Sequence, residues 1–215
     1  MTTRIVAIDG PAASGKSSVA RELARQIGFD YVNSGAMYRA VTWHVLQRGI
    51  DPADSAAVVR LLEGSRLDCD LVQGDSRISI DGVDPAEHLR DDRVNDEVSR
   101  ISSIPRVREI LVAEMRGYAK DHDVVMEGRD IGSVVFPETP YKFYIDASPD
   151  VRLRRRIAQG QRDQIAARDR ADSSRRASPL IIAEDAHVID SSNLTIEGVV
   201  GEIIGRLKMK GLIVN

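Results

Sequence analysis

The sequence predicts an α/β fold in which a parallel sheet is covered by helices on both faces and carries a small antiparallel insertion. Strand-like and helix-like patterns alternate along the chain, which is typical of parallel strands joined by crossover helices. Between residues 67 and 83 the apolar period changes to two, which indicates antiparallel pairing. With 215 residues, 42% of them apolar, the chain can form one packed domain with small insertions.

The elements follow in order from these patterns. The apolar run at 5–8 predicts a buried strand, and residues 17–27 an amphipathic helix, because Val19, Leu23 and Ile27 share one face. The next expected elements are a strand at 31–32, a helix over about 36–48 and a hairpin at 67–83. Further along, we expect strands at 124–126, 142–145 and 188–189, and helices around 94–101, 105–118, 149–159 and 194–207.

Composition excludes several classes of protein. Charged residues make up 29% of the chain and no long apolar stretch occurs, so we expect no membrane segment. A net charge of −3 gives no general attraction to nucleic acid. Cys69 is the single cysteine, and no Cys/His pair has zinc-ligand spacing. The apolar run at 5–8 is too short for an export signal, so we expect a cytoplasmic protein.

A glycine-rich loop carries the clearest chemical signal. It matches G-x-x-x-x-G-K-[ST] between an expected strand and an expected helix, the context that this pattern requires. Its inward N–H groups and the following helix dipole suit phosphate oxygens, Lys16 suits the β/γ-phosphates and Ser17 suits Mg²⁺. We therefore expect ATP and Mg²⁺ as cofactors, bound by Gly10, Pro11, Ala12, Ala13, Ser14, Gly15, Lys16, Ser17 and Ser18.

This loop does not decide the reaction, because regulatory GTPases, motor ATPases and small-molecule kinases share it. Arginines elsewhere narrow the choice. They recur in short polar motifs, two of which directly follow expected strands, where open α/β sheets bind ligands. Several arginines from separate segments can grip a second phosphate group. The motifs are Ser34-Gly35-Ala36-Met37-Tyr38-Arg39, Pro105-Arg106-Val107-Arg108-Glu109, Glu127-Gly128-Arg129-Asp130-Ile131-Gly132 and the run 168–175.

Together with the loop and Ser178-Pro179-Leu180, these motifs resemble the bacterial cytidylate kinase family over nearly the whole chain. The resemblance implies a P-loop nucleoside-monophosphate-kinase fold: a five-stranded parallel sheet, a nucleotide-binding insert with a small antiparallel sheet, and a short lid. It implies a core of residues 1–36, 104–150 and 176–215, an insert at 37–103 and a lid region at 151–175. It also implies transfer of phosphate from ATP to CMP or dCMP in pyrimidine nucleotide metabolism.

Residue roles follow from the same resemblance. Ser99, Arg108 and Asp130 match the cytosine-reading residues, a chemically sensible set because cytosine offers both donors and acceptors. Arg168 and Asp172 match the ribose-contacting pair. The arginines that hold the acceptor phosphate and the phosphate in transfer correspond to Arg39, Arg129 and Arg175, and Ser34 and Tyr38 are expected in the same pocket.

The expected chemistry is direct in-line transfer without a strong general base, because the acceptor phosphate oxygen is already anionic. Lys16, Arg129 and Arg175 are the expected catalytic residues. Ser17 is the expected Mg²⁺ ligand, with Asp9 or Glu127 acting through a metal-bound water.

Three points stay open at this level. The acceptor could be UMP, AMP or another small molecule such as shikimate. A regulatory P-loop NTPase is a further reading, although no Asn-Lys-x-Asp guanine motif occurs. The arginines at 152 and 154–156 suit either ATP contact or a solvated helix face. We expect nucleotides as partners of a monomer, with no nucleic acid and no membrane.

Overall fold

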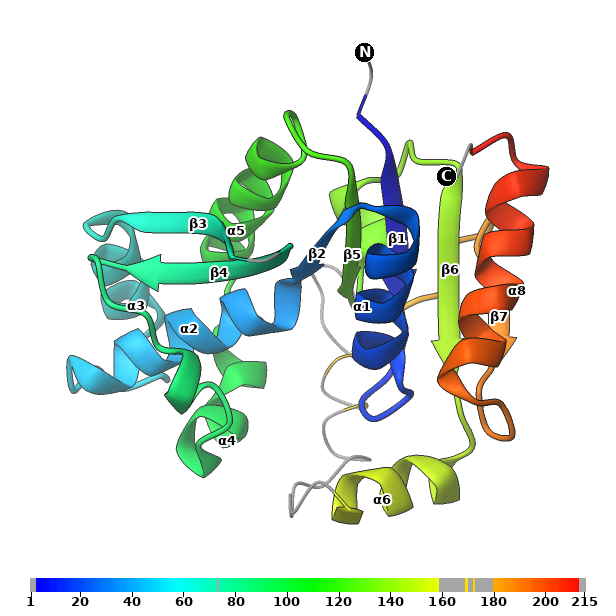
Figure 1. The fold of residues 1–215 in the computed structure, drawn as a ribbon. Coiled ribbons are helices and arrows are strands. Elements are labelled where there is room, and N and C mark those ends of the chain that lie inside the picture. The colour runs from blue at the N-terminus through cyan, green and yellow to red at the C-terminus, as the bar shows by residue number, and fades with distance from the viewer. Residues whose placement is uncertain (1–2, 73, 159–168, 170–171, 173–179, 213–215) are drawn as a thin grey trace.

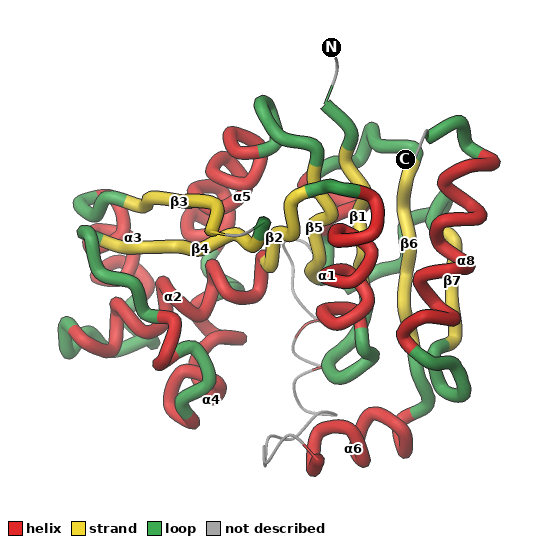
Figure 2. Tube along the Cα trace, in the orientation of Figure 1, coloured by secondary structure: helices red, strands yellow, loops and turns green. Residues whose placement is uncertain are grey.

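The computed structural model describes residues 3–72, 74–158, 169, 172 and 180–212. They form a seven-stranded sheet with the strand order β3-β4-β2-β5-β1-β6-β7, and helices cover both of its faces (Figures 1 and 2). The strands are β1 (Ile5–Asp9), β2 (Asp30–Asn33), β3 (Leu67–Val72), β4 (Asp75–Ile80), β5 (Val124–Gly128), β6 (Tyr141–Asp146) and β7 (His187–Asp190).

The helices of the described part of the chain alternate with these strands. They are α1 (Lys16–Ile27), α2 (Ser34–Gln47), α3 (Ser55–Glu63), α4 (Asp92–Ile101), α5 (Pro105–Tyr118), α6 (Pro149–Ala158) and α8 (Ile196–Met209). A short 3₁₀ helix at Ala86–His88 and a π-helical turn at Ile131–Val135 complete the set.

Five neighbouring strands, β2, β5, β1, β6 and β7, run parallel to one another, which confirms the predicted five-stranded parallel sheet. Their carboxyl ends lie at one edge, where Asn33 pairs with Glu127 and Asp9 pairs with Gly128. Open α/β sheets bind ligands outside this edge. The phosphate loop and the Glu127-Gly128-Arg129-Asp130 motif both start there.

The hairpin of β3 and β4 is antiparallel, as predicted, and pairs from Leu67 with Ile80 to Val72 with Asp75. It is not a separate sheet, because β4 joins the edge of β2 through one parallel pair, Tyr31 with Asp75. Figure 1 shows the hairpin, α2, α3 and α4 as one lobe on the side of the sheet where β2 lies, away from β6 and β7.

Two apolar layers hold the sheet, since successive residues of a strand face opposite sides. On β1, Val6 and Ile8 pack in the layer with α1 and α8, whereas Ala7 packs in the layer with α2 and α5. All three side chains are fully buried. This double coverage fixes the position of β1 and therefore of the loop that follows it.

The structure adds elements that the periodicity did not indicate. Helix α3 buries only Val58 and Leu62, which is too weak a stripe to stand out in the sequence. The expectation that Leu194 belongs to the last helix was wrong. The helix starts after Thr195, whose hydroxyl oxygen caps it by accepting from the Gly198 amide at 3.1 Å. Leu194 lies before this cap and is 43% exposed. None of the described helices has the length and apolar character to cross a membrane.

Candidate active site

The phosphate loop leaves β1 in a conformation that requires glycine. Gly10 has φ of 157°, and a Cβ placed there would lie 2.1 Å from the backbone oxygen of Ile145. Gly15 has φ of 92° and precedes the first residue of α1. These two positions let the loop curl between β1 and α1, the geometry that turns amide groups inward.

Arginines of α6 hold two carbonyl groups of this loop. Arg152 Nη1 donates to the Ala12 oxygen at 3.2 Å, and Arg155 Nη1 donates to the Ser14 oxygen at 3.0 Å. The buried hydroxyl of Ser191 donates to the same Ser14 oxygen at 2.8 Å. Two of the α6 arginines are therefore bound to the loop, whereas the neighbouring Arg154 is exposed.

A cavity of about 330 Å³ opens beside the loop. Polar groups of the loop, α6 and Ser191 line it together with apolar side chains at the start of α8 and just before that helix. Its walls include Ala13, Ser14, Gly15, Ser18, Arg155, Ser191, Leu194 and Ile196. Size, position and mixed lining suit the nucleoside of a donor nucleotide whose phosphates enter the loop.

Lys16 is buried and lies on the inner side of the loop. Its Nζ donates to the Pro11 oxygen at 3.0 Å and lies 4.0 Å from Glu127 Oε2. An ammonium group held in this way inside the loop is available to phosphate oxygens.

Glu127 connects the loop to the end of β5. Its Oε1 accepts from the Ser17 hydroxyl at 2.7 Å and from the Tyr31 hydroxyl at 3.4 Å. A hydroxyl and a carboxylate side by side are hard oxygen ligands of the kind that Mg²⁺ takes. The described residues contain no group of three or more His, Cys, Asp or Glu side chains that could hold a metal alone. Ser17 and Glu127 thus fit a Mg²⁺ that is held mainly by nucleotide phosphates and water.

Asp9, the other acid expected near the metal, is differently engaged. Its Oδ1 accepts from the Ile131 amide and its Oδ2 from the Gly132 amide, both at 2.8 Å. Burial raises the pKa of Asp9 to about 7, although the two amides work against this shift. Its carboxylate is committed to the π-helical turn.

Arg129, in the Glu127-Gly128-Arg129-Asp130 motif, contacts the phosphate loop. Its Nη1 donates to the Gly10 oxygen at 2.9 Å, and its Nε donates to Asp172 Oδ2 at 2.8 Å. Asp172 is 2% exposed, so this ion pair is largely withdrawn from water. The guanidinium therefore lies beside the first residue of the loop.

Arg108 and Asp130 form a buried ion pair, and both side chains are about 4% exposed. Arg108 Nη1 also donates to the Ser102 oxygen at 3.1 Å, and its guanidinium lies 5.3 Å from the ring centre of Tyr38. Arg108 Nε is buried and has no hydrogen-bond partner within the described chain. This donor without a partner and the paired carboxylate are buried polar groups that can form hydrogen bonds with a ligand.

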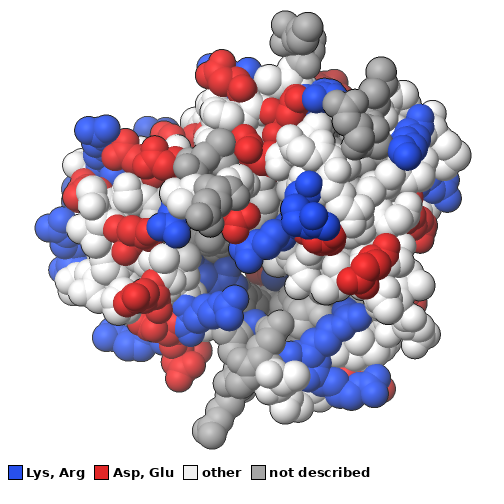
Figure 3. All heavy atoms as spheres, viewed as in Figure 1, with Lys and Arg blue, Asp and Glu red and all other residues white. Residues whose placement is uncertain are grey.

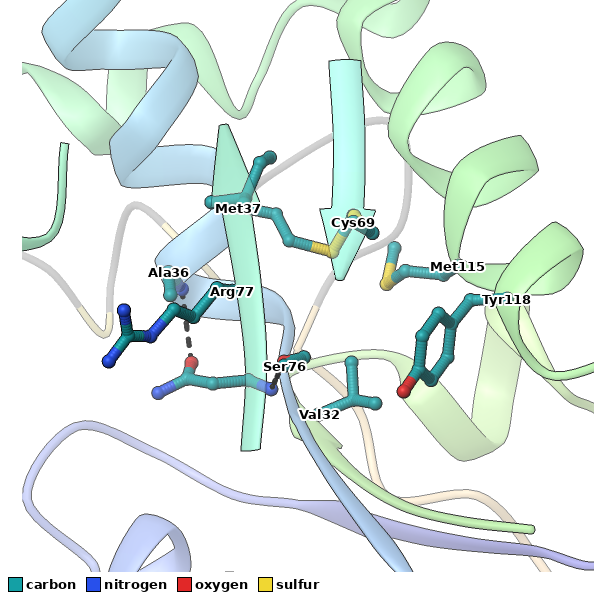
Figure 4. A pocket seen from close by; sticks show the side chains of 10 residues that line it. Val32, Ala36, Met37, Cys69, Ser76, Arg77, Met115 and Tyr118 are labelled. Carbon is teal, nitrogen blue, oxygen red and sulfur yellow. Dashed lines mark hydrogen bonds between the residues drawn. The ribbon is translucent and has the colours of Figure 1, made fainter. Parts of the chain in front are cut away.

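Helix α2 carries three of the residues that the sequence predicts at the acceptor phosphate, Ser34, Tyr38 and Arg39. Asn33 caps it by accepting from the Ala36 amide at 3.0 Å (Figure 4). Its first turns then carry Ser34, whose hydroxyl donates to the Glu127 backbone oxygen at 2.8 Å, and Arg39, which donates to the Gly35 oxygen at 2.9 Å. The narrow pocket of Figure 4 lies between α2, the β3–β4 hairpin and α5. Its lining is mostly apolar and includes Met37, Cys69, Met115 and Tyr118.

The remaining expected residues are placed unevenly. Ser99 is half-buried on α4, where its backbone oxygen accepts from the Ser102 hydroxyl at 3.2 Å. Arg168, Arg175 and the stretch 159–167 lie outside the described residues. In Figure 3, Lys and Arg side chains line a hollow between the lobe of α2–α4 and the part that holds α1 and α6.

The sequence interpretation missed Asp169. Its Oδ1 accepts from the Ala12 amide at 3.3 Å, and its other oxygen pairs with Arg152. The backbone amide of Ala12, in the phosphate loop, is thus hydrogen-bonded to a carboxylate of the same chain. The one available signal was its place in the Arg168-Asp169-Arg170-Ala171-Asp172 run, which does not indicate a contact 157 residues away.

Comparison with known proteins identifies the family. The family model described as cytidylate kinase matches residues 6–209. Cytidylate kinase of Pelotomaculum thermopropionicum is 42% identical over 214 residues, which cover 94% of this chain and 95% of that protein. The Mycobacterium leprae cytidylate kinase is 41% identical over 222 residues, with 98% of each chain covered.

Solved structures resemble the chain more distantly. Shikimate kinase from Acinetobacter baumannii in complex with shikimate aligns with 99% of this chain and 97% of its own, at 13% identity and a TM-score of 0.49. Likeness at that level does not bear on the acceptor. The family match, which spans nearly all of the sequence, does: this chain belongs to the cytidylate kinase family.

Proposed function

We propose that this enzyme moves the γ-phosphoryl group of Mg·ATP directly onto the 5′-phosphate of CMP or dCMP, giving ADP and CDP or dCDP. One observation carries the proposal. Arg129, from the motif assigned to the acceptor, donates to the Gly10 oxygen of the loop assigned to the donor at 2.9 Å. A guanidinium at this junction can contact the acceptor phosphate and the group in transfer together.

The donor half consists of residues 10–18 and the cavity of about 330 Å³ beside them. We assign the phosphates to the loop amides and Lys16, and the adenosine to the cavity walled by Arg155 and Ser191. Phosphate binding at a loop that opens a helix follows from the inward amides and the helix dipole. Asp169 would leave the Ala12 amide when phosphate binds, because both compete for one donor.

We assign the acceptor half to α2, α4, α5, the end of β5 and the run 168–175. We assign Arg39, Arg129 and Arg175 to the phosphates, Arg168 and Asp172 to the ribose, and Ser34 and Tyr38 to the pocket wall. Ser99, Arg108 and Asp130 are assigned to the cytosine. The buried Arg108 can donate to cytosine O2 and N3, and Asp130 can accept from the N4 amino group.

Mg²⁺, when bound, would supply positive charge that offsets the negative charge of the phosphates. Ser17 would hold it directly and Glu127 through a water. We prefer Glu127 to Asp9, because Glu127 contacts the Ser17 hydroxyl at 2.7 Å, whereas both Asp9 oxygens accept backbone amides.

In the transfer step, these residues align the two nucleotides and stabilise negative charge. Lys16, Arg129 and Arg175 hold the γ-phosphoryl oxygens as charge shifts toward the leaving ADP. The acceptor oxygen attacks in line without losing a proton, so no side chain has to act as a strong base. Exclusion of water from the hollow between the two halves prevents wasteful hydrolysis.

The proposal divides the chain into a core (1–36, 104–150 and 176–215), a nucleotide-binding insert (37–103) and a lid region (151–175). The insert contains α2 from Met37 onward, α3, α4 and the β3–β4 hairpin. We further propose a cytoplasmic monomer, and sedimentation of the purified enzyme at assay concentrations tests its oligomeric state.

The decisive experiment is a coupled ADP assay with Mg·ATP and a panel of CMP, dCMP, UMP, AMP and shikimate. We expect the highest kcat/KM with CMP or dCMP, and little ADP without an acceptor. A preference for AMP or shikimate would replace the acceptor but keep the kinase. ADP formation that ignores every acceptor would instead favour a regulatory NTPase.

A further inference from the structure

We infer that Asp9 is a positioning residue, which ties the phosphate loop to the turn that carries Arg129 and Asp130. This inference rests on the proposed function for the roles of Arg129 and Asp130. It departs from the view of Asp9 as a partner of a metal-bound water.

The contacts of Asp9 form a clamp between segments more than 120 positions apart. Asp9 ends β1 and lies beside Gly128 of β5. Its side chain is buried, and each oxygen accepts one backbone amide at 2.8 Å, from Ile131 and from Gly132. A carboxylate with two amide donors of this geometry fixes the backbone that supplies them.

The clamped amides begin the π-helical turn Ile131–Val135. Amides at the start of a helical turn have no partner within it, and here Asp9 supplies their acceptors. The fit is close, because a Cβ on Gly132 would lie 3.4 Å from Asp9 Oδ2 and 3.1 Å from Lys142 Cγ. The start of the turn therefore packs closely against Asp9 of β1 and Lys142 of β6.

Arg129 and Asp130 are held from both sides by this arrangement. After them come the two amides bound to Asp9. On the other side, Gly10, the first residue of the phosphate loop and the chain neighbour of Asp9, accepts from Arg129 through its backbone oxygen at 2.9 Å. One carboxylate thus sets the distance between the arginine at the transfer point and the loop, and the direction of the Asp130 ion pair with Arg108.

Asp9→Asn tests the clamp, because it keeps size and removes one acceptor. At pH 8, we expect kcat to fall about tenfold and KM for CMP to rise, since small misplacements at a reacting centre are costly. The KM for ATP and the half-saturating Mg²⁺ concentration should stay within twofold of wild type. Asp185→Asn is the matched control: it breaks an ion pair with Lys142, next to the turn, without touching either amide.

A double-mutant cycle identifies the route of the effect. If Asp9 acts through Arg129, adding Asp9→Asn to Arg129→Ala should lower kcat by less than twofold further. An additive loss of kcat together with a raised Mg²⁺ requirement would overturn the inference and restore the metal-water role. A kinetic profile of Asp9→Asn equal to that of Asp185→Asn would overturn it as well.

A measurement on the wild-type protein covers the case in which Asp9→Asn does not fold. The amide protons of Ile131 and Gly132 should titrate together with the Asp9 carboxyl group in NMR spectra, with Lys16 and Asp130 as the neighbouring charges. Amide shifts that ignore this titration would exclude the clamp. This readout needs no substrate, so it remains informative even if the acceptor panel contradicts the proposed function.

Discussion

The Ser17 hydroxyl donates to Glu127 Oε1 at 2.7 Å, which joins the first turn of α1 to the end of β5. The two residues are 110 positions apart and belong to different motifs, the phosphate loop and Glu127-Gly128-Arg129-Asp130. The Tyr31 hydroxyl lies 3.4 Å from the same oxygen and helps to orient the carboxylate. This contact places the hydroxyl and the carboxylate that we propose as the Mg²⁺ site side by side.

Glu127→Gln tests the metal assignment. We expect the half-saturating Mg²⁺ concentration in the ADP assay to rise about tenfold or more, as is typical when an outer-sphere partner is lost. Glu109→Gln, at an exposed position of α5, is the control. A lower kcat with unchanged Mg²⁺ dependence would show that Glu127 acts in some other way.

Arg129→Ala tests whether Arg129, which contacts the Gly10 oxygen, acts on the phosphoryl group in transfer. Loss of an arginine that meets the transferring phosphoryl group lowers kcat by about 10³-fold or more. The Kd for ATP should change far less, because loop amides and Lys16 still hold the donor. Arg25→Ala, which removes only a surface ion pair with Glu22, should behave as wild type. An unchanged kcat in Arg129→Ala contradicts the assigned role.

Asp130→Asn tests base selection. Cytosine presents an amino donor where uracil presents a carbonyl acceptor, so the amide of asparagine can donate to uracil as the carboxylate cannot. We expect the ratio of kcat/KM for CMP to that for UMP to fall about tenfold. Asp96→Asn, on the exposed face of α4, is the control. A ratio that does not change would remove Asp130 from cytosine recognition.

Arg155→Met tests whether α6 shapes the donor site. Arg155 binds the Ser14 oxygen at 3.0 Å and the Ser191 oxygen at 2.8 Å, and it also lines the donor cavity. We expect the KM for ATP to rise about tenfold, which is the effect of losing one charged hydrogen bond to the bound nucleotide. The KM for CMP should not move. Arg154→Met, one position earlier and exposed, is the matched control, and equal ATP kinetics for both variants would refute the role of Arg155.

Stability should depend on pH through Asp9. Burial raises its pKa to about 7 from 3.8, so the folded state binds the proton more tightly than the unfolded state. The resulting stabilisation is present below about pH 4 and is lost as the pH rises toward 7, by about 4 kcal/mol in all. Urea unfolding of wild type and Asp9→Asn from pH 4.5 to 7.5 checks this. Parallel stability curves would contradict the shift.

The order of strands and helices was predictable because apolar periodicity is a local property. The buried runs that became β1, β5 and β6 and the amphipathic stripes of α1 and α5 stand in the sequence itself. Helix α3 and the Ile131–Val135 turn escaped prediction, since the former buries two side chains and the latter depends on Asp9 as an external acceptor. The single pair that joins the hairpin to β2 likewise has no local signal.

The sequence by itself determined the chemistry that is contiguous in the chain: a glycine-rich loop with Lys16 and Ser17, and a set of arginine motifs that match one family. Only the tertiary structure decided which groups meet. It paired Ser17 with Glu127, Arg129 with Gly10 and Asp9 with the 131–132 amides. The physical reason is that the residues of a phosphate loop are neighbours along the backbone and can be recognised in the sequence. A hydrogen bond between residues more than 100 positions apart depends instead on which strands pair in the sheet.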